Sequence, residues 1–341
     1  MTPLTDAVES LAEATRFSGV VRVDGPGGPE LERAYGFADR GHQIANRTDT
    51  RFGLASGTKG LTALTIVSLI ADGSLSLETT ARSLLGDDLP LIDDAVTIEQ
   101  LLSHRSGIGD YLDESQLEDG NDYTMTVPVH RLATTEDYLA VLEGHPTAFP
   151  PGERFSYCNG GFVVLALIAE RRSGVAFHDL VRERVCEPAG MVDTAFLRSD
   201  ELPGDAALGY LGVDGLRTNV LHLPVRGSGD GGIYSTAADV AALWRAFFGG
   251  RIVPEPRVAE MVRPRGVDAR DASRYGLGFW LHPSREVVIL EGADVGVSFR
   301  TAHDPASNVT TTVISNTTDG AWPMSELLEE RLGEGSATVP A

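Results

Sequence analysis

The residues best suited to covalent chemistry in this chain are Ser56 and Lys59. They lie three positions apart in RFGLASGTKGLTALTIVSLI, where residues 57–71 have the pattern of a mostly apolar helix. Side chains at this spacing project from one face of a helix, about one turn apart. Because serine alone is a poor nucleophile and a nearby amine can take its proton, the pair predicts nucleophilic catalysis by Ser56.

Lys59 is also the only lysine in the chain, in which arginine supplies the other long basic side chains. Arginine can replace lysine at most surface positions, but it cannot act as a proton acceptor near neutral pH. The single lysine therefore indicates that an amine is needed at this position. The alternative interpretation is structural: Ser56 would cap the helix, and Lys59 would extend into solvent.

A second candidate group is Tyr157 and Asn159 in FPPGERFSYCNGGF. A tyrosine can act as a general base when a nearby ammonium group stabilises its phenolate, and an asparagine amide can bind both a substrate carbonyl and the lysine. The alternative is a turn over 150–152, followed by a helix over 160–172 with Asn159 as its N-cap. Cys158 between the two residues has no histidine nearby in sequence, which disfavours a catalytic thiol.

The elements that must position these residues follow a simple order along the chain. Strand patterns gather at both ends, and helical patterns fill the middle. We therefore predict an α/β (α+β) fold, in which an antiparallel sheet built from both chain ends and flanked by helices forms a discontinuous domain of residues 1–59 and 216–341. A mainly helical domain of residues 60–215 is expected between these parts, with the active site at the interface.

Individual elements can be placed from the same patterns. Strands over 18–24 and 29–39 are expected to form a hairpin around GPGG, and Thr236 with Asp239 is expected to form a capping box. A polar, acidic loop over 109–133 is a candidate cover for the cleft, although a solvated loop is the simpler interpretation. The other strands are predicted over 286–292, 297–303 and 308–316, and the other helices over 3–16, 97–103, 134–143, 236–248 and 323–332.

The charge balance narrows the range of partners. Acidic residues outnumber basic ones by 49 to 28, for a formal net charge of -21, and such a chain repels phosphate backbones and anionic lipid. No apolar run reaches the roughly 18 residues of a membrane span, and the first residues lack the pattern of a secretory signal. We expect a cytoplasmic protein that binds a small-molecule or short-peptide substrate, with no nucleic-acid or membrane partner. The sequence leaves the oligomeric state open.

Neither a metal nor an organic cofactor is expected. Two cysteines cannot build a cysteine-rich metal site, and the eight histidines do not pair at helical metal-binding spacing. GSGDGG at 227–232 matches a dinucleotide-binding glycine spacing, but no parallel strand–helix unit surrounds it. The chain has no Gly-x-Ser-x-Gly sequence, which disfavours an α/β-hydrolase.

Together these motifs resemble the class C β-lactamase-like, penicillin-binding-protein-like serine hydrolases. That family includes β-lactamase-related esterases, D-aminopeptidases and acyltransferases. Ser56 with Lys59 matches the family's Ser-x-x-Lys motif, and Tyr157 with Asn159 matches its Tyr-x-Asn motif. Further segments are similar to the family in the family order, over about residues 17–316: TIEQLLSHRSGIGDY at 97–111, GGIYSTAADVAAL at 231–243 and YGLGFWL at 275–281.

The resemblance implies the fold already predicted and a role for each motif residue. Ser56 would be the acylated nucleophile. Lys59 and Tyr157 would share the proton transfers, and Asn159 would orient the substrate. No metal or cofactor is implied by the resemblance.

The resemblance also implies an oxyanion-binding site. One donor would be the backbone N–H of Ser56, and the other would lie on a strand edge after the third family motif. In this sequence that edge is Gly292 and Ala293. We therefore expect both residues to contact the substrate.

The third motif itself departs from the family pattern. Relatives carry Lys-Thr-Gly or His-x-Gly, whereas this chain has Leu290-Glu291-Gly292 and lacks the cation that helps to hold a substrate carboxylate. Loss of one charge-assisted hydrogen bond costs about 1.5–3 kcal/mol, which is enough to change substrate preference. Arg226 and Arg300 are candidate replacements for this cation.

These observations favour a serine hydrolase, an esterase or amidase, that acts through a covalent acyl-Ser56 intermediate on an ester or amide of a small molecule or peptide. Three alternatives stay open. The first is an acyltransferase that uses the same acyl-enzyme, and the second is a β-lactamase or D,D-peptidase. The third is a non-catalytic binding protein that has kept the pocket.

Overall fold

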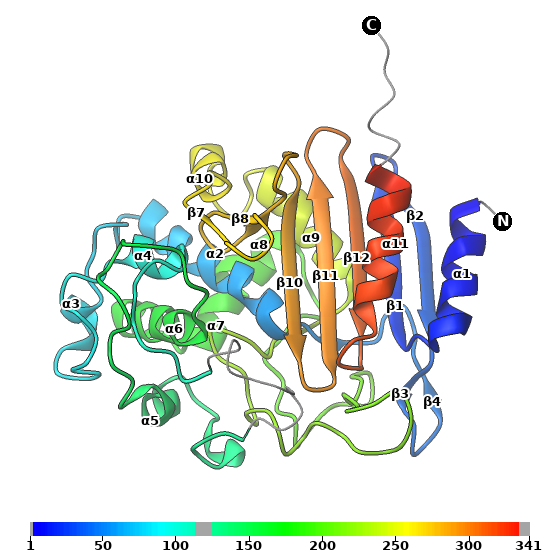
Figure 1. Cartoon of the computed structure of the whole chain (residues 1–341), viewed down its shortest axis with the longest axis horizontal. Coiled ribbons are helices and arrows are strands. Elements are labelled where there is room, and N and C mark those ends of the chain that lie inside the picture. The colour runs from blue at the N-terminus through cyan, green and yellow to red at the C-terminus, as the bar shows by residue number, and fades with distance from the viewer. Residues whose placement is uncertain (1–2, 113–123, 334–341) are drawn as a thin grey trace, which may run out of the picture.

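An antiparallel sheet flanked by helices forms the centre of the computed structural model, which describes residues 3–112 and 124–333 (Figure 1). The strand order is β2-β1-β12-β11-β10-β9-β8-β7, and the predicted fold class is confirmed. Residues 113–123, in the middle of the predicted acidic loop, lie outside the described residues. The long strands are β1 (Gly19–Gly25), β2 (Gly28–Tyr35), β10 (Val288–Asp294), β11 (Val297–Asp304) and β12 (Val309–Ser315).

The N-terminal and C-terminal parts of the chain meet inside this sheet, at its second and third strands. Strand β1 pairs with β12 from Gly19 opposite Ser315 to Asp24 opposite Thr310. Beyond β10 the sheet continues through three two-residue strands, β9 (Trp280–Leu281), β8 (Arg274–Tyr275) and β7 (Gly266–Val267). These strands were not predicted, because two residues are too few to show a periodic pattern.

The predicted strand over 29–39 is wrong at its end. Strand β2 stops at Tyr35, and β3 (Phe37–Asp39) pairs with β4 (Ile44–Ala45) in a separate two-stranded sheet. Between them Gly36 has φ 70°, and a Cβ there would lie 2.4 Å from Ser18 Oγ. The close approach and the left-handed backbone both require glycine, and they turn the chain out of the large sheet.

Each face of the large sheet is covered by different helices. Helices α1 (Pro3–Thr15) and α11 (Ala321–Gly333) lie in front of it in Figure 1 and pack on the apolar side chains of β1, β2 and β12. Helices α2 (Thr58–Ala71) and α9 (Ala237–Phe248) belong to the larger core on the other face, together with Leu290 and Phe299. The strand that carries the third motif, β10, is therefore held mainly by the core on the α2 and α9 face, through Leu290.

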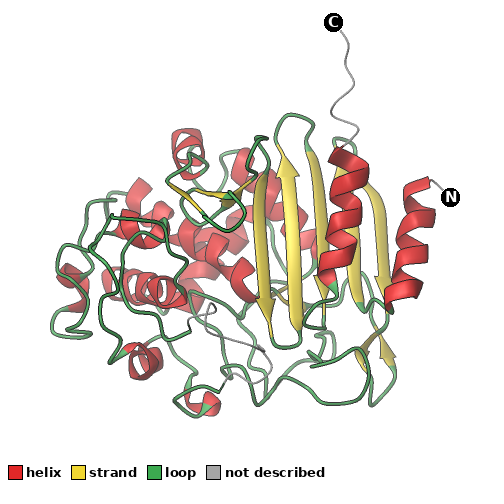
Figure 2. Ribbon diagram, in the orientation of Figure 1, coloured by secondary structure: helices red, strands yellow, loops and turns green. Residues whose placement is uncertain are grey.

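Most of the other helices lie to one side of the large sheet and contribute to the same core (Figure 2). Helix α6 (Asn159–Ser173) is buried along most of its length, as expected for a helix that is apolar on all sides. The helix predicted over 134–143 is only a 3-10 turn (Glu136–Tyr138) and a single α-helical turn, α5 (Leu139–Leu142). The remaining α-helices of the described residues are α3 (Arg82–Leu85), α4 (Ile98–Leu102), α7 (Phe177–Val181), α8 (Glu187–Ala189) and α10 (Glu255–Met261). Within the described ranges, none of the helices has both the length and the apolar character of a membrane span.

The expected capping box at Thr236 is only half present. Thr236 accepts a hydrogen bond from Asp239 N, but the Asp239 carboxylate accepts from Thr194 and from Asp193 N instead of turning back to the cap. The complete capping box lies at α4, where Thr97 and Gln100 exchange both bonds. The division of the chain into two domains stays a prediction.

Candidate active site

Ser56 lies in a tight turn between a strand and a helix. Strand β5 (Phe52–Gly53) leads into the 3-10 turn η1 (Ala55–Gly57), and α2 begins at Thr58. Ala55 has φ 45°, a left-handed conformation that is strained for a residue with a side chain. Thr58 Oγ1 donates to Ala55 O at 2.7 Å and holds the turn closed. Ser56 is therefore fixed at the start of the helix, where free N–H groups favour negative charge.

Lys59 is buried beside Ser56, with 2% of its surface exposed. Its Nζ donates to Ser56 Oγ at 2.8 Å, to Asn159 Oδ1 at 2.8 Å and to the Asp230 carbonyl at 2.7 Å. The structure therefore brings the serine and the lysine together, and the alternative of a solvated lysine does not hold.

The Tyr157 ring lies against the lysine. Lys59 Nζ is 4.9 Å from the centre of the Tyr157 ring, which stacks on Trp280 and lies 4.4 Å from the His104 ring. An ammonium over an aromatic ring is attracted to it, and it also favours ionisation of a nearby phenol. Tyr157 and Ser56 line the same hollow, so the structure groups Ser56, Lys59, Tyr157 and Asn159.

Asn159 is positioned by a carboxylate that sequence reasoning did not identify. Asn159 is the first residue of α6 and not its N-cap, so the alternative interpretation of Asn159 as an N-cap is wrong. Asp110 accepts hydrogen bonds from Asn159 N at 2.6 Å and from Gly160 N at 2.8 Å, and Asn159 Nδ2 donates to Leu112 O. A carboxylate from another segment thus caps the helix that presents Asn159 to the lysine.

The second fixed acceptor of Lys59 is held from the same segment. Tyr111 donates a short hydrogen bond to the Asp230 carboxylate, while the Asp230 carbonyl accepts from Lys59. Residues 110–112 therefore contact both Asn159 and Asp230. In the sequence, Asp110 and Tyr111 end the family-like segment TIEQLLSHRSGIGDY at 97–111. The similarity of this segment to the family did not assign a role to either residue.

Burial controls the protonation of the groups around this centre. Burial raises the pKa of Asp110 to about 6, although its backbone N–H donors lower it. Burial also raises the pKa of Asp230, although the positive charge of Lys59 lowers it. Burial also holds the pKa of His104 well below its usual value, so this ring is neutral, and its Nδ1 accepts from Cys158 N. Burial raises the pKa of the Cys158 thiol well above its usual value, which argues against a catalytic thiolate.

Two hollows meet at Ser56, and Ala293 borders both. The first is lined largely by apolar and aromatic side chains such as Tyr111, Leu112 and Leu223. The second is more polar and charged, and its lining includes Tyr157, Trp280, Trp322, Arg270, Glu291 and Arg300. A substrate carbonyl at Ser56 would therefore have one substituent in each environment.

Gly292 lies directly against the turn that carries Ser56. A Cβ on Gly292 would be 2.3 Å from Leu54 O and 2.6 Å from Ser56 N, so only glycine allows β10 to approach this closely. Leu290 instead points to the core, where a Cβ on Gly60 would lie 2.6 Å from it. Leucine at the third motif therefore fills space against α2 in place of a cation.

Of the two candidate replacement cations, the structure brings only one to the site. Arg300 lines the polar hollow beside Ser56 and donates to Glu291 at 2.7 Å. Arg226 borders neither hollow at Ser56, and its Nε donates to Phe196 O.

This site and fold correspond to a known family. The family model described as Beta-lactamase matches residues 4–333, and the chain belongs to the β-lactamase family. It is similar to a D-aminopeptidase of Brucella anthropi, with 29% identity over 329 residues that cover 94% of this chain and 60% of the relative. It is also similar to esterase EstB of Burkholderia gladioli, with 32% identity over 209 residues, or 57% and 51% of the two chains.

A solved structure shows the same fold over almost the whole chain. The penicillin binding protein from Bacillus halodurans has a TM-score of 0.88 and 35% sequence identity, covering 95% of this chain and 99% of that one. The first curated relatives are longer proteins, of which this chain spans between 42% and 63%. The resemblance inferred from the motifs is therefore confirmed at the level of the family.

Proposed function

We propose that this chain is a serine hydrolase that cleaves an ester or amide of a small molecule or short peptide through an acyl-Ser56 intermediate. The observation that carries the proposal is the 2.8 Å contact between Lys59 Nζ and Ser56 Oγ in a buried site. The names of the two relatives, an aminopeptidase and an esterase, support hydrolysis of amide and ester substrates.

Acylation would begin with the Ser56 hydroxyl. Its proton passes to the Lys59–Tyr157 pair as Oγ bonds to the substrate carbonyl carbon, and the electron pair of the C=O bond moves to oxygen. The backbone N–H groups of Ser56 and Ala293 would hold this oxyanion. When the intermediate collapses, the bond to the leaving group breaks and the leaving group takes the proton.

Deacylation would repeat the same proton path with water. Water gives a proton to the Lys59–Tyr157 pair while its oxygen bonds to the acyl carbon. Collapse of the second intermediate breaks the bond to Ser56 Oγ, which takes the proton back. Asn159 would orient the substrate carbonyl from the start of α6, where Asp110 holds it.

The test is intact-protein mass spectrometry after exposure to p-nitrophenyl acetate. We expect one acetyl adduct on Ser56, no adduct in Ser56→Ala, and a normal adduct in the control Ser10→Ala, whose serine is exposed on α1. An unmodified wild-type protein would contradict the proposal and support the binding-protein alternative. Because Leu290 replaces the third-motif cation, a penicillin should label Ser56 much more slowly than the ester does.

A further inference from the structure

A groove on the outer face of the sheet lies apart from Ser56. It runs between α11 and the exposed face of β10 and β11, which no helix covers in Figure 1. Its volume is about 250 Å³, slightly below the range of roughly 300–1,000 Å³ of ordinary ligand pockets. Its floor and walls are mainly apolar, formed by Val287, Ile289, Ala302, Val309, Leu328 and Leu332.

A buried hydroxyl without a partner lines this groove. Ser325 on α11 is 9% exposed, and among the described residues no group accepts from or donates to its Oγ. Buried polar groups are normally hydrogen-bonded. The hydroxyl therefore marks a place where a polar group of a ligand can be bound at the edge of an apolar surface.

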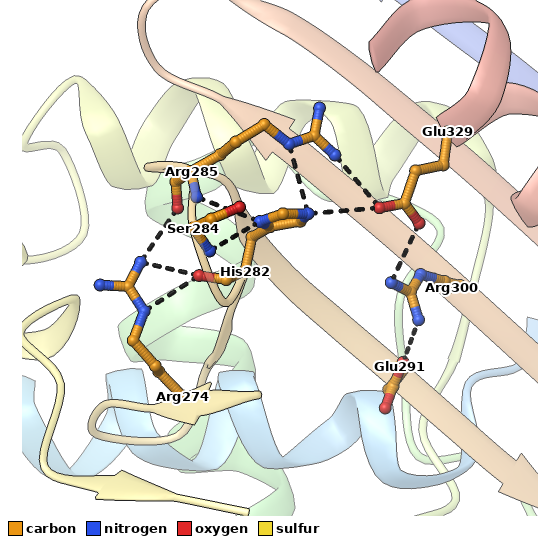
Figure 3. Close-up of polar contacts among 7 residues, drawn as sticks. All are labelled: Arg274, His282, Ser284, Arg285, Glu291, Arg300 and Glu329. Carbon is orange, nitrogen blue, oxygen red and sulfur yellow. Dashed lines mark hydrogen bonds and ion pairs between the residues drawn. The ribbon is translucent and has the colours of Figure 1, made fainter. Parts of the chain in front are cut away.

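A cluster around the Glu329 carboxylate also lines the groove, one helical turn after Ser325 on α11 (Figure 3). The Glu329 carboxylate is 3.1 Å from Arg285, 3.6 Å from Arg300 and 3.5 Å from His282 Nε2. His282 Nδ1 accepts from Ser284 N and Arg285 N, and Arg285 Nε donates to His282 Nε2 at 3.3 Å. Two guanidinium groups and the His282 ring thus surround one carboxylate, which belongs to a 43% exposed side chain of the protein itself.

Arginine also fixes the loop that carries this cluster. Arg274 donates to the carbonyls of His282 and Arg285, so the donors are held in place before any ligand binds. The other acids nearby are Glu291, which pairs with Arg300, and Asp304, which accepts from Ala306 N and Ser307 Oγ. Glu329 is the acid that contacts both Arg285 and Arg300.

We propose that this groove binds a small aliphatic carboxylate, whose charged end replaces Glu329 at Arg285 and Arg300 and whose chain covers the apolar floor. Ser325 would donate to the same carboxylate. Arg300 also lines the hollow beside Ser56 and pairs with Glu291 there. The groove and the active site therefore have Arg300 in common. The binding step does not depend on the proposed hydrolase activity.

Titration calorimetry with octanoate tests the site directly. We expect saturable binding at one site and at least tenfold weaker binding by Arg285→Gln, because a charge-assisted hydrogen bond is lost. Ala302→Phe should abolish binding by filling the floor. The matched control is Arg33→Gln, a half-exposed arginine on β2 outside the groove, which should bind octanoate like the wild type.

The most decisive variant in this titration is Glu329→Gln. Because Glu329 competes with the ligand for the same donors, its neutral variant should bind octanoate several-fold more tightly than the wild type. Acetate, which lacks the chain, and octylammonium, which lacks the anion, should both bind at least tenfold more weakly than octanoate. The inference is overturned if the wild type does not bind octanoate, if Glu329→Gln weakens binding, or if octylammonium binds equally well. Labelling of Ser56 by the ester tests the hydrolase proposal, and octanoate binding tests the groove. Either proposal can therefore fail without the other.

Discussion

At the scale of single residues, Asp110 shows how a group outside the catalytic motifs can determine the geometry of the site. Its carboxylate accepts from the first two backbone N–H groups of α6 and so fixes Asn159, an acceptor of Lys59. The bond from Asn159 N is only 2.6 Å long, as expected when the acceptor is ionised. Small displacements here would be transmitted to the lysine.

We therefore expect Asp110→Asn to slow acylation of Ser56 roughly tenfold or more. An amide can accept through only one atom and would turn its NH2 toward the other helix N–H, a loss of about 1–3 kcal/mol. The rate is measured as the burst of nitrophenol from p-nitrophenyl acetate. Asp179→Asn, which changes an exposed aspartate on α7, is the control. An unchanged burst in Asp110→Asn would show that the helix cap has no part in the reaction.

At the scale of elements, the junction of β10 with η1 is the contact that places the strand edge beside Ser56. The two backbones meet at Gly292, where a Cβ would overlap Leu54 O and Ser56 N. Both atoms belong to backbone, so neither can move without displacing the strained turn at Ala55.

Gly292→Ala should therefore reduce the acylation rate at least a hundredfold, because it separates the two proposed oxyanion donors. The measurement is the same nitrophenol burst, with circular dichroism to follow folding. Gly27→Ala is the matched control, since no heavy atom outside its chain neighbours lies within 4 Å of a Cβ there. A folded Gly292→Ala protein with a wild-type burst would contradict an oxyanion site at this junction.

The positions of elements were predictable where a pattern is local. The apolar alternation at both chain ends placed the long strands, and the apolar run after Ser56 placed α2 within a residue. The capping of α6 was not predictable, because Asp110 and Asn159 are 49 residues apart and only the fold brings them together. The break at Gly36 was missed for the same reason, since its close neighbour Ser18 lies on another segment.

At the scale of the whole molecule, buried histidines couple stability to pH. Burial lowers the pKa of His303 to about 4; its Nδ1 contacts Thr310 Oγ1 and its ring stacks on Trp244. Between pH 6.5 and 4 the unfolded chain binds this proton more readily than the folded protein. The contribution to stability is therefore complete above pH 6.5 and is lost as the pH falls to 4.

His303→Gln should remove this dependence. The variant should lose less unfolding free energy than the wild type when the pH falls from 7 to 4, by at most about 3 kcal/mol. Urea unfolding at both pH values measures the difference. The same substitution at the exposed His130 is the matched control. Identical losses in the wild type and His303→Gln would contradict the assignment.

The third motif also illustrates what a sequence can and cannot show about a whole site. The absence of a cation at Leu290 was visible in the sequence, and so were Arg226 and Arg300 as candidates to replace it. Only the register of β10 against β11, which sets Glu291 opposite Arg300, showed which arginine reaches the hollow. The contact between Arg300 and Glu329 depends on how α11 packs on the sheet.

The central claim is that the Lys59–Tyr157 pair takes the proton of Ser56, and Lys59→Arg tests this most directly. The substitution keeps the positive charge but removes a group that can accept a proton near neutral pH. General-base catalysis contributes roughly 10²–10⁴-fold, so the nitrophenol burst should slow at least a hundredfold, while Arg47→Lys on the exposed surface leaves it unchanged. A folded Lys59→Arg protein that acylates Ser56 at the wild-type rate would contradict the account.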